Sequence, residues 1–397
     1  MKVFQINTVC GVGSTGRIAT DLYHVLAEEG HSCCVAYGRG TAPAGIDSYK
    51  IGSTLDVYAH TMCSRMTDGE GLYSSSATKR LVEKIEAYAP DIIHLHNIHG
   101  HYLNYPILFR FLKEYDRPVV WTLHDCWPFT GHCAYFDFIG CQLWQSGCHD
   151  CPQLSAYPKS YGMDHSRENF ARKKQLFTGL RQLVLVTPSQ WLADLVKKSF
   201  LGTYPVQVIH NGIDTTVFKP TPSDFRERYG LQDKKIILGV ASPWTARKGL
   251  QDFIKLSKML PEEWKIVLVG LSKKQLKTIP AAITGIERTN NVQELAQIYT
   301  AADVFFNPTY EDNYPTTNLE AIACGTPVIT YDTGGSPESM GNENGAVVGK
   351  GNLNDAWSSL LHAVGYKKPF SADCRKYDKT QRFGDYYRLY QQLAIED

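Results

Sequence analysis

The sequence predicts an α/β protein with two Rossmann-like domains, each built on a parallel sheet. The chain has 397 residues, which is too long for one compact core. A strand, a loop, a helix and a second strand follow one another at the N-terminus, and the pattern restarts near residue 236. We expect a first domain over 1–205, a second domain over 206–380, and a closing helix over 381–397 that packs back on the first domain. The two domains are expected to face each other across a cleft.

Composition narrows the class of partner. The chain carries 41 basic and 40 acidic residues, so a bulk polyanion such as nucleic acid is not an expected partner. No apolar stretch approaches the roughly 18–20 residues that cross a membrane. The first residues read as a strand and not as an export signal. Eleven cysteines without such a signal indicate reduced thiols or metal ligands, and we expect a cytoplasmic protein.

A glycine-rich loop, GVGSTG, follows the first predicted strand and precedes a helix expected over 17–29. Its glycines, Gly13 and Gly16 among them, let backbone amides approach a phosphate or a sugar. Tyr37-Gly38-Arg39 stands where a dinucleotide-binding domain has an acidic residue for the ribose, so dinucleotide binding is disfavoured. Glycines that only permit a tight turn are the alternative.

Histidines gather at the ends of the next strands. Residues 41–77 look polar and irregular, with a mobile loop over 69–76. The string HLHNIHGHY, from His94, holds two His-x-His pairs, but hydrogen-bonded histidines at a strand end are favoured over a metal site. The strand over 119–123 delivers His124 at its carboxyl end, where it is a candidate group of the cleft. A histidine satisfied by local backbone is the alternative.

A cysteine-rich insertion of the first domain is expected near 126–152. Four cysteines have the spacing C-x7-C-x6-C-x2-C: Cys133, Cys141, Cys148 and Cys151. Glycines precede two of them, as a tight metal knuckle requires, and four thiolates suit a tetrahedral zinc ion that pins a loop without a core of its own. Two disulfides, free thiols and an iron–sulfur cluster are alternatives, and His132 and His149 are substitute ligands.

The second domain opens with a strand at 236–241 and the stretch SPWTARK, which ends in Arg247 and Lys248. A basic pair just before a helix N-terminus is well placed for a diphosphate, because the helix dipole and the two cations add. Surface charges that are only solvated are the alternative.

A second strand–loop–helix–strand unit spans residues 307–338, NPTYEDNYPTTNLEAIACGTPVITYDTGGSPE. The pattern predicts a strand over 301–306, a loop and then a helix from about Asn318. Ligands bind at the carboxyl ends of strands in open α/β sheets. Asp312 and Glu320 lie where such a ligand is expected.

This order of motifs resembles a GT-B glycosyltransferase, and more closely the retaining, metal-independent family 4 of those enzymes. The resemblance covers nearly the full chain, and its specific part is a Glu-x7-Glu signature with a Gly-Gly-x-Pro-Glu turn. The matching residues are Asp312, Glu320, Ala321, Cys324-Gly325, Pro327-Val328 and Gly334-Gly335-Ser336-Pro337-Glu338. Three features depart from the pattern: Asp312 replaces the first glutamate, with Glu311 one position early; Pro243 replaces an arginine; and the cysteine cluster resembles only a subset linked to exported polysaccharides.

The resemblance implies a role for each matched residue. Glu320 would hold the donor ribose, Lys248 would neutralise the diphosphate with help from Arg247, and His124 would lie near the reacting carbon. The domain over 1–205 would be the acceptor side, with Gly13 and Gly16 in its glycine loop, and the domain over 206–380 would bind the nucleotide sugar. Asp312 and the neighbouring backbone would cradle the transferred sugar and its phosphate. The implied donor-binding set is Gly13, Gly16, Asn313, Tyr314, Pro315, Thr316, Asn318, Leu319 and Glu320.

The implied reaction moves a sugar from a nucleotide-diphosphate sugar to a hydroxyl of a glycan or lipid-linked glycan, in polysaccharide biosynthesis. Cations and helix amides would stabilise the charge on the leaving phosphate, with no cofactor required for catalysis. Retention follows if the leaving phosphate and the incoming hydroxyl share one face of the sugar, and the departing phosphate can then act as the base.

Two other functions remain open. A sugar-nucleotide epimerase on the same scaffold would place paired carboxylates across the cleft, for which His94 and His96 are poor substitutes. A non-catalytic carbohydrate-binding protein would not need the diphosphate lysine. A lipid-carried acceptor would bring the enzyme to the inner face of the membrane as a peripheral protein. Lys173-Lys174 and Lys197-Lys198 are candidate contacts, although such pairs are more often solvated helix faces.

Overall fold

The computed structural model describes residues 1–341, 343–365 and 372–395. The chain divides into two compact units. The first consists of Met1–His210 and Phe383–Asp397, and the second of Asn211–Arg382. Each unit has its own parallel sheet and its own hydrophobic core, which confirms the prediction of a two-domain α/β protein.

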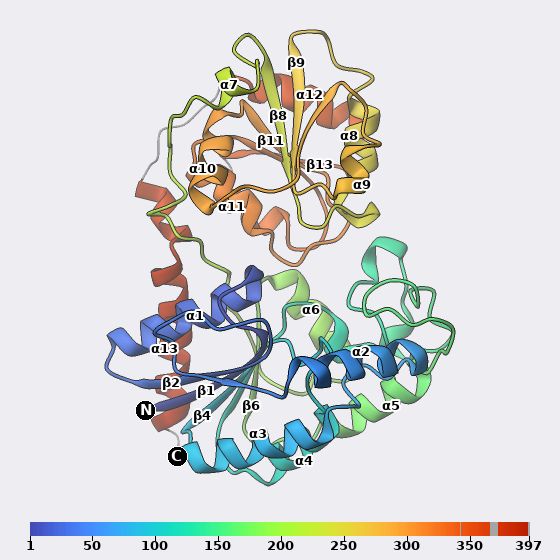
Figure 1. The fold of residues 1–397 in the computed structure, drawn as a ribbon, viewed down its shortest axis with the longest axis vertical. Coiled ribbons are helices and arrows are strands. Elements are labelled where there is room, and N and C mark those ends of the chain that lie inside the picture. Colours follow the sequence, from blue (N-terminus) through green and yellow to red (C-terminus); the bar gives the residue numbers. More distant parts are fainter. Residues whose placement is uncertain (342, 366–371, 396–397) are drawn as a thin grey trace. The chain divides into compact units, whose positions relative to one another are not determined.

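The first unit is built on a seven-stranded parallel sheet in the order β3-β2-β1-β4-β5-β6-β7 (Figure 1). Its strands are β1 (Lys2–Val9), β2 (Ser32–Arg39), β3 (Ser48–Lys50), β4 (Ile92–Leu95), β5 (Val119–Thr122), β6 (Leu183–Thr187) and β7 (Val206–Val208). The chain proceeds outward from β1 to β3 and then returns to β4 on the other side of β1. The order therefore reverses between β1 and β4, where open sheets of this kind bind ligands.

Helices cover this sheet because each has an apolar stripe that the strands bury. They are α1 (Gly13–Glu28), α2 (Thr54–Thr67), α3 (Ser75–Tyr88), α4 (Tyr105–Glu114), α5 (Ser166–Phe177), α6 (Gln190–Lys198) and α13 (Lys379–Ile395). Three short 3-10 turns lie between β5 and α5: η1 (Trp127–Phe129), η2 (Asp137–Ile139) and η3 (Leu143–Gln145). The strands β1, β2, β4, β5 and β6 are almost wholly buried, as expected of a parallel sheet covered on both faces.

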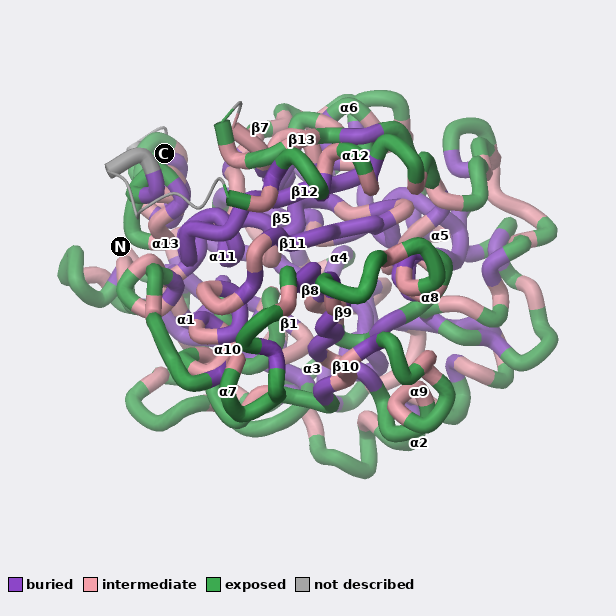
Figure 2. The backbone as a smooth tube through the Cα atoms, turned by 90° about the horizontal axis from the view of Figure 1, so that it is seen from above, coloured by how far each residue is buried: buried purple, intermediate pink, exposed green. Residues whose placement is uncertain are grey.

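The second unit repeats the arrangement with a six-stranded parallel sheet in the order β10-β9-β8-β11-β12-β13. Its strands are β8 (Lys235–Val240), β9 (Trp264–Val269), β10 (Ile283–Ile286), β11 (Val304–Asn307), β12 (Val328–Tyr331) and β13 (Gly345–Val348). The order reverses between β8 and β11. Figure 2 shows β11 and β12 as buried along their length, while many of the loops that join the elements are exposed.

Short helices cover the second sheet and bury two apolar clusters against it. They are α7 (Phe225–Arg228), α8 (Leu250–Leu256), α9 (Lys273–Leu276), α10 (Val292–Ala301), α11 (Thr316–Ala323) and α12 (Leu353–Ala363). Three 3-10 turns complete the unit: η4 (Ala246–Lys248), η5 (Pro337–Ser339) and η6 (Ala372–Tyr377). Strand β11 begins later than the sequence pattern indicates, because α10 continues through Ala301.

The sequence reading of residues 41–77 as irregular is wrong, because this stretch contains α2. Ser53 and Asp56 form a capping box that starts the helix, but only two of its residues, His60 and Ser64, are buried. A helix with so narrow a buried stripe gives little periodic signal. The expected mobile loop over 69–76 also begins with three buried residues, including the carboxylate of Glu70.

The closing helix α13 packs on the sheet of the first unit, as predicted. Phe383, Tyr386 and Tyr390 share a buried cluster with residues of β1, α1 and β5. The packing is also polar. The Tyr390 hydroxyl lies 2.5 Å from His94 Nδ1, and the Tyr386 hydroxyl lies 3.1 Å from Thr122 Oγ1. Because buried polar groups need partners, these bonds fix the position of the helix on the strands.

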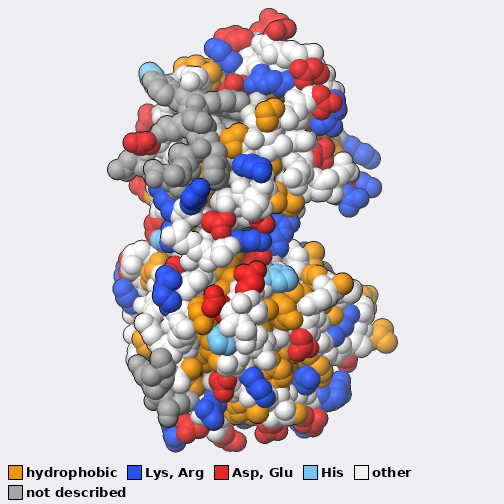
Figure 3. All heavy atoms as spheres, turned by 90° about the vertical axis from the view of Figure 1, so that its left-hand side faces the viewer, with side chains coloured by type: hydrophobic (Ala, Val, Ile, Leu, Met, Phe, Trp, Pro, Cys, Tyr) orange, Lys and Arg blue, Asp and Glu red, His pale blue; other side chains and the backbone are white. Residues whose placement is uncertain are grey.

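Surface charge and hydropathy agree with the composition. Lysine, arginine, aspartate and glutamate side chains are mixed over the face drawn in Figure 3, as the net charge of +1 predicts. Among the described residues, no helix combines the length and the apolar character that crossing a membrane requires.

We predict that Tyr390→Phe destabilises the first unit. Loss of the hydroxyl leaves His94 Nδ1 buried without its partner, which costs about 1–3 kcal/mol. Urea unfolding, followed by circular dichroism, should show a lower unfolding free energy. Tyr58→Phe, on an exposed side chain of α2, is the control and should leave stability unchanged. Equal stability of the two variants would contradict the account.

Candidate active site

The predicted donor residues of the second unit lie at one edge of its sheet. Turn η4 follows β8, the loop with Asp312 follows β11, and the Gly334-Gly335 turn follows β12. These three strands are neighbours and parallel, so their carboxyl ends meet at the same edge. The edge includes the point between β8 and β11 where the strand order reverses, which is the expected position of a ligand site.

An ion pair joins two of these segments. Lys248 Nζ in η4 donates a hydrogen bond to Asp312 Oδ2, and both side chains are partly exposed, at 25% and 17%. Gly249, next to Lys248, has a φ of 74°, and a Cβ there would lie 2.1 Å from the carbonyl oxygen of Pro308. Only glycine therefore lets η4 approach the loop after β11 closely enough for the ion pair.

Arg247 fixes the same loop through its backbone. Its guanidinium Nη1 donates to the carbonyl oxygen of Glu311 at 2.5 Å, and its own carbonyl oxygen accepts from the amide of Tyr310 at 2.7 Å. Thr309 also donates its hydroxyl to the Glu311 carbonyl oxygen, at 3.1 Å. The two cations predicted to meet a diphosphate are therefore both held against the segment that carries Asp312.

The Gly-Gly turn after β12 closes the third side. The amide of Gly335 donates to the carbonyl oxygen of Asp312 at 2.9 Å. Gly334 has a φ of 56°, and a Cβ there would lie 2.1 Å from the same carbonyl oxygen. The glycines of the GGSPE motif thus permit close backbone packing against Asp312.

Glu320 lies on α11, which begins at Thr316, slightly earlier than predicted. Its carboxylate is 8% exposed, and Oε2 accepts a hydrogen bond from the Tyr299 hydroxyl at 3.0 Å. Burial, followed by the charge of Glu320, raises the pKa of Tyr299 well above its usual value, so this tyrosine stays a hydrogen-bond donor. Glu320 is therefore an oriented carboxylate near the middle of α11.

Other predicted donor residues have side chains used within the unit. Leu319 is 0% exposed and belongs to the apolar core. The Asn318 amide bonds Asn307, Ser336 and Ser339 at 2.8, 3.1 and 2.8 Å, so it links β11, α11 and the turn after β12.

The remaining donor-loop residues surround the start of α11. Asn313 and Tyr314 are buried, Pro315 caps the helix, and Thr316 is its first residue. For all of these positions, the role in binding a donor stays a prediction.

The glycine loop of the first unit forms the first turn of α1, which begins at Gly13 and not at residue 17. Gly13 is exposed, and a Cβ there would meet nothing within 4 Å. Gly16 is buried, and a Cβ would lie 3.1 Å from Val9 Cγ2 and 3.2 Å from the Gly11 amide nitrogen. Gly16 therefore serves close packing of helix on strand, while Gly13 keeps the helix N-terminus uncovered within the unit.

A chain of side-chain hydrogen bonds orients His124, which follows β5. Gln5 Nε2 donates to the Ala19 carbonyl oxygen, so Gln5 Oε1 accepts from His96 Nε2, at 3.0 Å. Neutral His96 then has a bare Nδ1, which accepts from His124 Nε2 at 3.1 Å. The proton of neutral His124 is thereby assigned to Nε2, and its Nδ1 is an acceptor. Burial lowers the pKa of His124 to about 4, which keeps the ring neutral at pH 7.

Sequence reasoning did not find the partners around His124. Next to it, Asp125 Oδ2 accepts from His99 Nε2 at 2.9 Å, and Oδ1 accepts from the Trp127 amide at 3.0 Å. His99 Nδ1 lies 2.9 Å from the Tyr157 hydroxyl. In the sequence, the string HLHNIHGHY was the only signal of these contacts. Its histidines were predicted to be hydrogen-bonded, and the structure shows such bonds.

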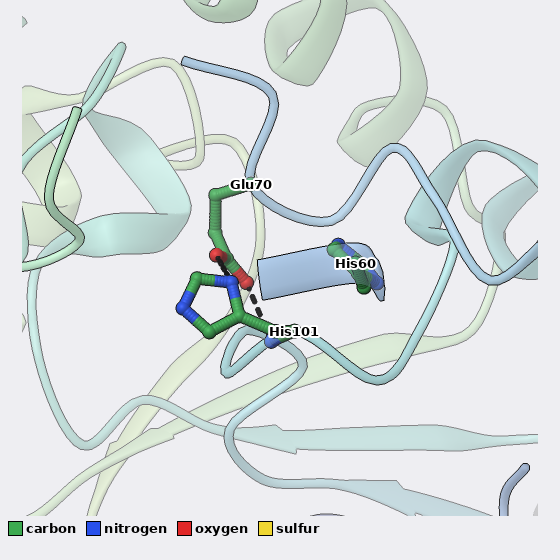
Figure 4. A group of neighbouring side chains, drawn as sticks. All are labelled: His60, Glu70 and His101. Carbon is green, nitrogen blue, oxygen red and sulfur yellow. Dashed lines mark hydrogen bonds and ion pairs between the residues drawn. The ribbon is translucent and has the colours of Figure 1, made fainter. Parts of the chain in front are cut away.

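A third histidine group lies beside α2. Among the described residues, the one set of potential metal-ligating atoms lying within 4.8 Å of one another comes from His60, Glu70 and His101. Figure 4 shows the Glu70 carboxylate facing His101. Glu70 Oε1 accepts a hydrogen bond from the backbone amide of His101 at 2.9 Å. His60 Nε2 accepts from the Gly71 amide at 3.2 Å, and its Nδ1 lies 2.8 Å from Ser74 Oγ. Glu70 Oε2 also forms an ion pair with His101 Nδ1, so contacts within the group and with neighbouring backbone hold the three side chains.

The four predicted zinc ligands lie in the segment between η1 and α5. Cys133 is buried, the other three are partly exposed, and none forms a disulfide among the described residues.

The prediction that Lys173-Lys174 contacts a membrane is wrong for Lys173, because this residue is buried. Lys173 is 1% exposed, with Nζ donating to the carbonyl oxygens of Trp127 and Thr130 at 2.8 and 3.1 Å. A buried ammonium held by the fold cannot bind a lipid surface.

We predict that the first unit loses stability as pH falls from about 6.5 toward 4. Burial lowers the folded pKa of His124 to about 4, below the usual value of about 6.5 for histidine, so the unfolded chain binds more protons in this window. Stability is fully present above 6.5 and falls with pH, and His124→Asn should reduce the pH slope by about one proton. Denaturant unfolding at pH 4.5–7.5 measures it, with exposed His24→Asn as control. A slope unaffected by His124→Asn would contradict the assignment.

Comparison with known proteins agrees with the two-unit architecture. The sequence profile described as "Glycosyltransferase Family 4" matches residues 15–217, which is more than half of the chain. The profile "Glycosyl transferases group 1" matches residues 234–364. The putative colanic acid biosynthesis glycosyl transferase WcaC of Escherichia coli K12 is 27% identical over 425 residues, covering 99% of this chain and 100% of WcaC.

Solved structures show the same fold at low identity. Sucrose-phosphate synthase from Thermosynechococcus elongatus has a TM-score of 0.70 at 14% identity, with 100% of both chains covered. HepE of Anabaena, in complex with UDP-glucose, has a TM-score of 0.65 at 15% identity, covering 99% of this chain and 100% of HepE. With both parts of the chain matched by profiles of this kind, the protein belongs to glycosyltransferase family 4 and is a glycosyltransferase of the GT-B fold.

Proposed function

We propose that the enzyme transfers a sugar from a nucleotide-diphosphate sugar to a hydroxyl of a glycan or lipid-linked glycan, with retention and without a catalytic metal. One observation carries the proposal: two cations and a carboxylate meet at the carboxyl edge of the second sheet, and a second carboxylate lies on the helix that follows β11. They are Arg247, Lys248, Asp312 and Glu320. The family membership, the UDP-glucose complex of HepE and the name of the E. coli relative support this reading.

Lys248 and Arg247 are the groups that we assign to the diphosphate. An ammonium has three donors, so Lys248 can keep its bond to Asp312 and still donate to a phosphate oxygen. Arg247 uses one guanidinium nitrogen on the Glu311 carbonyl oxygen, which orients the group without neutralising its charge. Both cations then face the diphosphate from a preorganised position, which is the arrangement that stabilises developing charge.

Glu320 is assigned to the ribose. A carboxylate is an acceptor with two oxygens, and it suits a pair of neighbouring hydroxyl donors. Oε2 is oriented by the Tyr299 hydroxyl, so the carboxylate is held before the ligand arrives. Asp312 and the backbone around Asn313 are assigned to the transferred sugar and its phosphate, because the Gly335 amide and the Lys248 ammonium fix that stretch.

The bond changes balance without a protein nucleophile. The bond between the anomeric carbon and the donor phosphate oxygen breaks, and its electron pair goes to the phosphate. The acceptor oxygen forms its bond to the anomeric carbon on the same face, and its proton goes to the departing phosphate oxygen. Neutral His124, held by His96, would meet the sugar as a hydrogen-bonding partner near the reacting carbon.

Polysaccharide biosynthesis is the proposed setting, with the active enzyme in the cytoplasm. A lipid-linked acceptor would bring it to the inner face of the membrane as a peripheral protein. Of the basic pairs considered, Lys197 and Lys198 are exposed at the end of α6 and remain available for an anionic surface.

We predict that Lys248→Ala lowers donor turnover by about 10²–10³-fold, because one stabilising donor to the leaving phosphate is lost. Release of nucleoside diphosphate from a panel of nucleotide sugars, beginning with UDP-glucose, measures the effect. Lys258→Ala, on an exposed lysine after α8, is the matched control and should keep wild-type turnover. Wild-type turnover in Lys248→Ala would show that the diphosphate is held elsewhere.

The same donor panel separates the alternative functions. Binding without turnover of any donor would favour a carbohydrate-binding protein, and interconversion of donor sugars would favour an epimerase.

Glu320 can be tested through the ligand. The wild type should bind the nucleoside diphosphate about tenfold or more tightly than its 2′-deoxy or 3′-deoxy analogue, because a hydrogen bond to a charged group contributes about 1.5–3 kcal/mol. Glu320→Gln should lose most of this preference while binding the deoxy analogues almost as the wild type does. Calorimetry measures both affinities. A preference that persists in Glu320→Gln would remove the ribose role from this residue.

A further inference from the structure

The segment between η1 and α5 brings its four cysteines into one neighbourhood. The thiol of Cys133 is hydrogen-bonded to the sulfur of Cys151. Burial, and then the adjoining charges of Cys151 and Cys141, raise the pKa of the Cys148 thiol to about 11. The sulfurs therefore lie close enough for their charges to interact, although the four cysteines are spread between residues 133 and 151.

Backbone amides point at two of these sulfurs. The Gly131 amide donates to Cys148 Sγ at 3.1 Å, and the Gln153 amide donates to the sulfur of Cys151. Gly131 has no room for a side chain, because a Cβ there would lie 2.1 Å from the Ser166 carbonyl oxygen and 2.7 Å from Cys148 Cβ. Such amide donors stabilise thiolates, which are the form that binds a metal.

A buried cation lies beside the cluster. Lys173 Nζ meets two carbonyl oxygens and lies 3.4 Å from the centre of the Trp127 ring. Burial lowers the pKa of Lys173 to about 7, and the neighbouring Cys148 and Asp68 oppose this shift. An ammonium that is 1% exposed needs a nearby anion, and a cluster of metal-bound thiolates carries net negative charge.

The buried imidazole of His132 also lies beside the cysteine cluster. His132 Nδ1 bonds the Asp68 carboxylate, and His132 Nε2 is buried and has no hydrogen-bond partner among the described residues. The charge of His132 acts on both Cys151 and Asp164, which places the ring next to the sulfurs. An unpartnered nitrogen in this position indicates that a ligand belongs to the site, since buried polar atoms are rarely left unsatisfied.

We propose that this segment binds one Zn²⁺ through the thiolates of Cys133, Cys141, Cys148 and Cys151. The amide donors and the buried ammonium fit a negatively charged tetrathiolate centre, and the unpartnered His132 Nε2 is the substitute ligand beside it. No three of the four sulfurs lie within 4.8 Å of one another, so the ion would have to draw them together as it binds. Zinc with four protein ligands has no open position, and the site is therefore structural and independent of the sugar-transfer chemistry.

The consequence of binding is a rigid segment beside the His124 strand end. The Tyr161 amide bonds the Arg65 carbonyl oxygen at 2.8 Å, and the His165 amide bonds Asp68 Oδ2 at 2.9 Å, which tie the segment to α2. At its start, the Trp127 amide bonds Asp125, the residue after His124. The zinc ion thus closes a long connection that has few helices or strands of its own (Figure 1).

Metal analysis of the full-length protein, purified under reducing conditions and without chelator, tests the proposal. We expect about one zinc per chain in the wild type and less than about a fifth of that in Cys148→Ser and Cys141→Ser, since each loses a ligand. Cys63→Ser changes an exposed cysteine of α2 and should keep the full zinc content. Circular dichroism identifies any variant that fails to fold.

A measurement on the folded wild type removes the dependence on variants. A thiol-blocking mercurial should release the zinc to a colorimetric indicator, and trypsin should then cleave between residues 131 and 165 at least tenfold faster. Wild-type protein that lacks zinc even after reconstitution, or that contains iron and sulfide instead, overturns the proposal. Retention of zinc in Cys141→Ser together with its loss in His132→Ala would contradict the four-thiolate ligand set.

Discussion

The ion pair between Lys248 and Asp312 is the interaction on which the proposed donor site of this enzyme depends. It joins the segment after β8 to the segment after β11, across the point where the strand order reverses. Both side chains are partly exposed, so the pair by itself adds little stability and is still open to a ligand. Its value is geometric: Gly249, Gly334 and Arg247 bring the backbone close enough for a cation and a carboxylate to meet at the sheet edge. A diphosphate arriving there would find charge already oriented.

The first unit uses buried polar chains for the same purpose. Gln5 and His96 set the protonated nitrogen of His124. His94, two residues before His96 and on β4, is held by Thr122 and by Tyr390 of the closing helix. Every buried imidazole in this series stays neutral because burial disfavours its charged form. Family membership explains the overall fold and the enzyme class, whereas these contacts explain how this particular chain fixes its histidines.

Much of this architecture could be predicted because it depends on local pattern. Apolar strands alternating with helices predicted the α/β class, and the spacing from Asp312 to Glu338 predicted the family. Helix α2 was missed because it buries too little surface to leave a periodic signal, and Lys173 was misjudged because a basic helix face gives no sign of burial. The partnership of Gln5 with His96 spans 91 residues, and no local pattern reports a contact of that kind. Fine geometry at the site therefore required the fold.

The central claim is that the second unit binds the nucleotide-diphosphate part of the donor at the edge formed by β8 and β11. A crystal structure of the protein with a bound nucleoside diphosphate tests it most directly. The account predicts phosphate oxygens within hydrogen-bonding distance of Lys248 and Arg247, and ribose hydroxyls on the carboxylate of Glu320. A nucleotide bound at the glycine loop of the first unit, with Lys248 still paired only to Asp312, would contradict it.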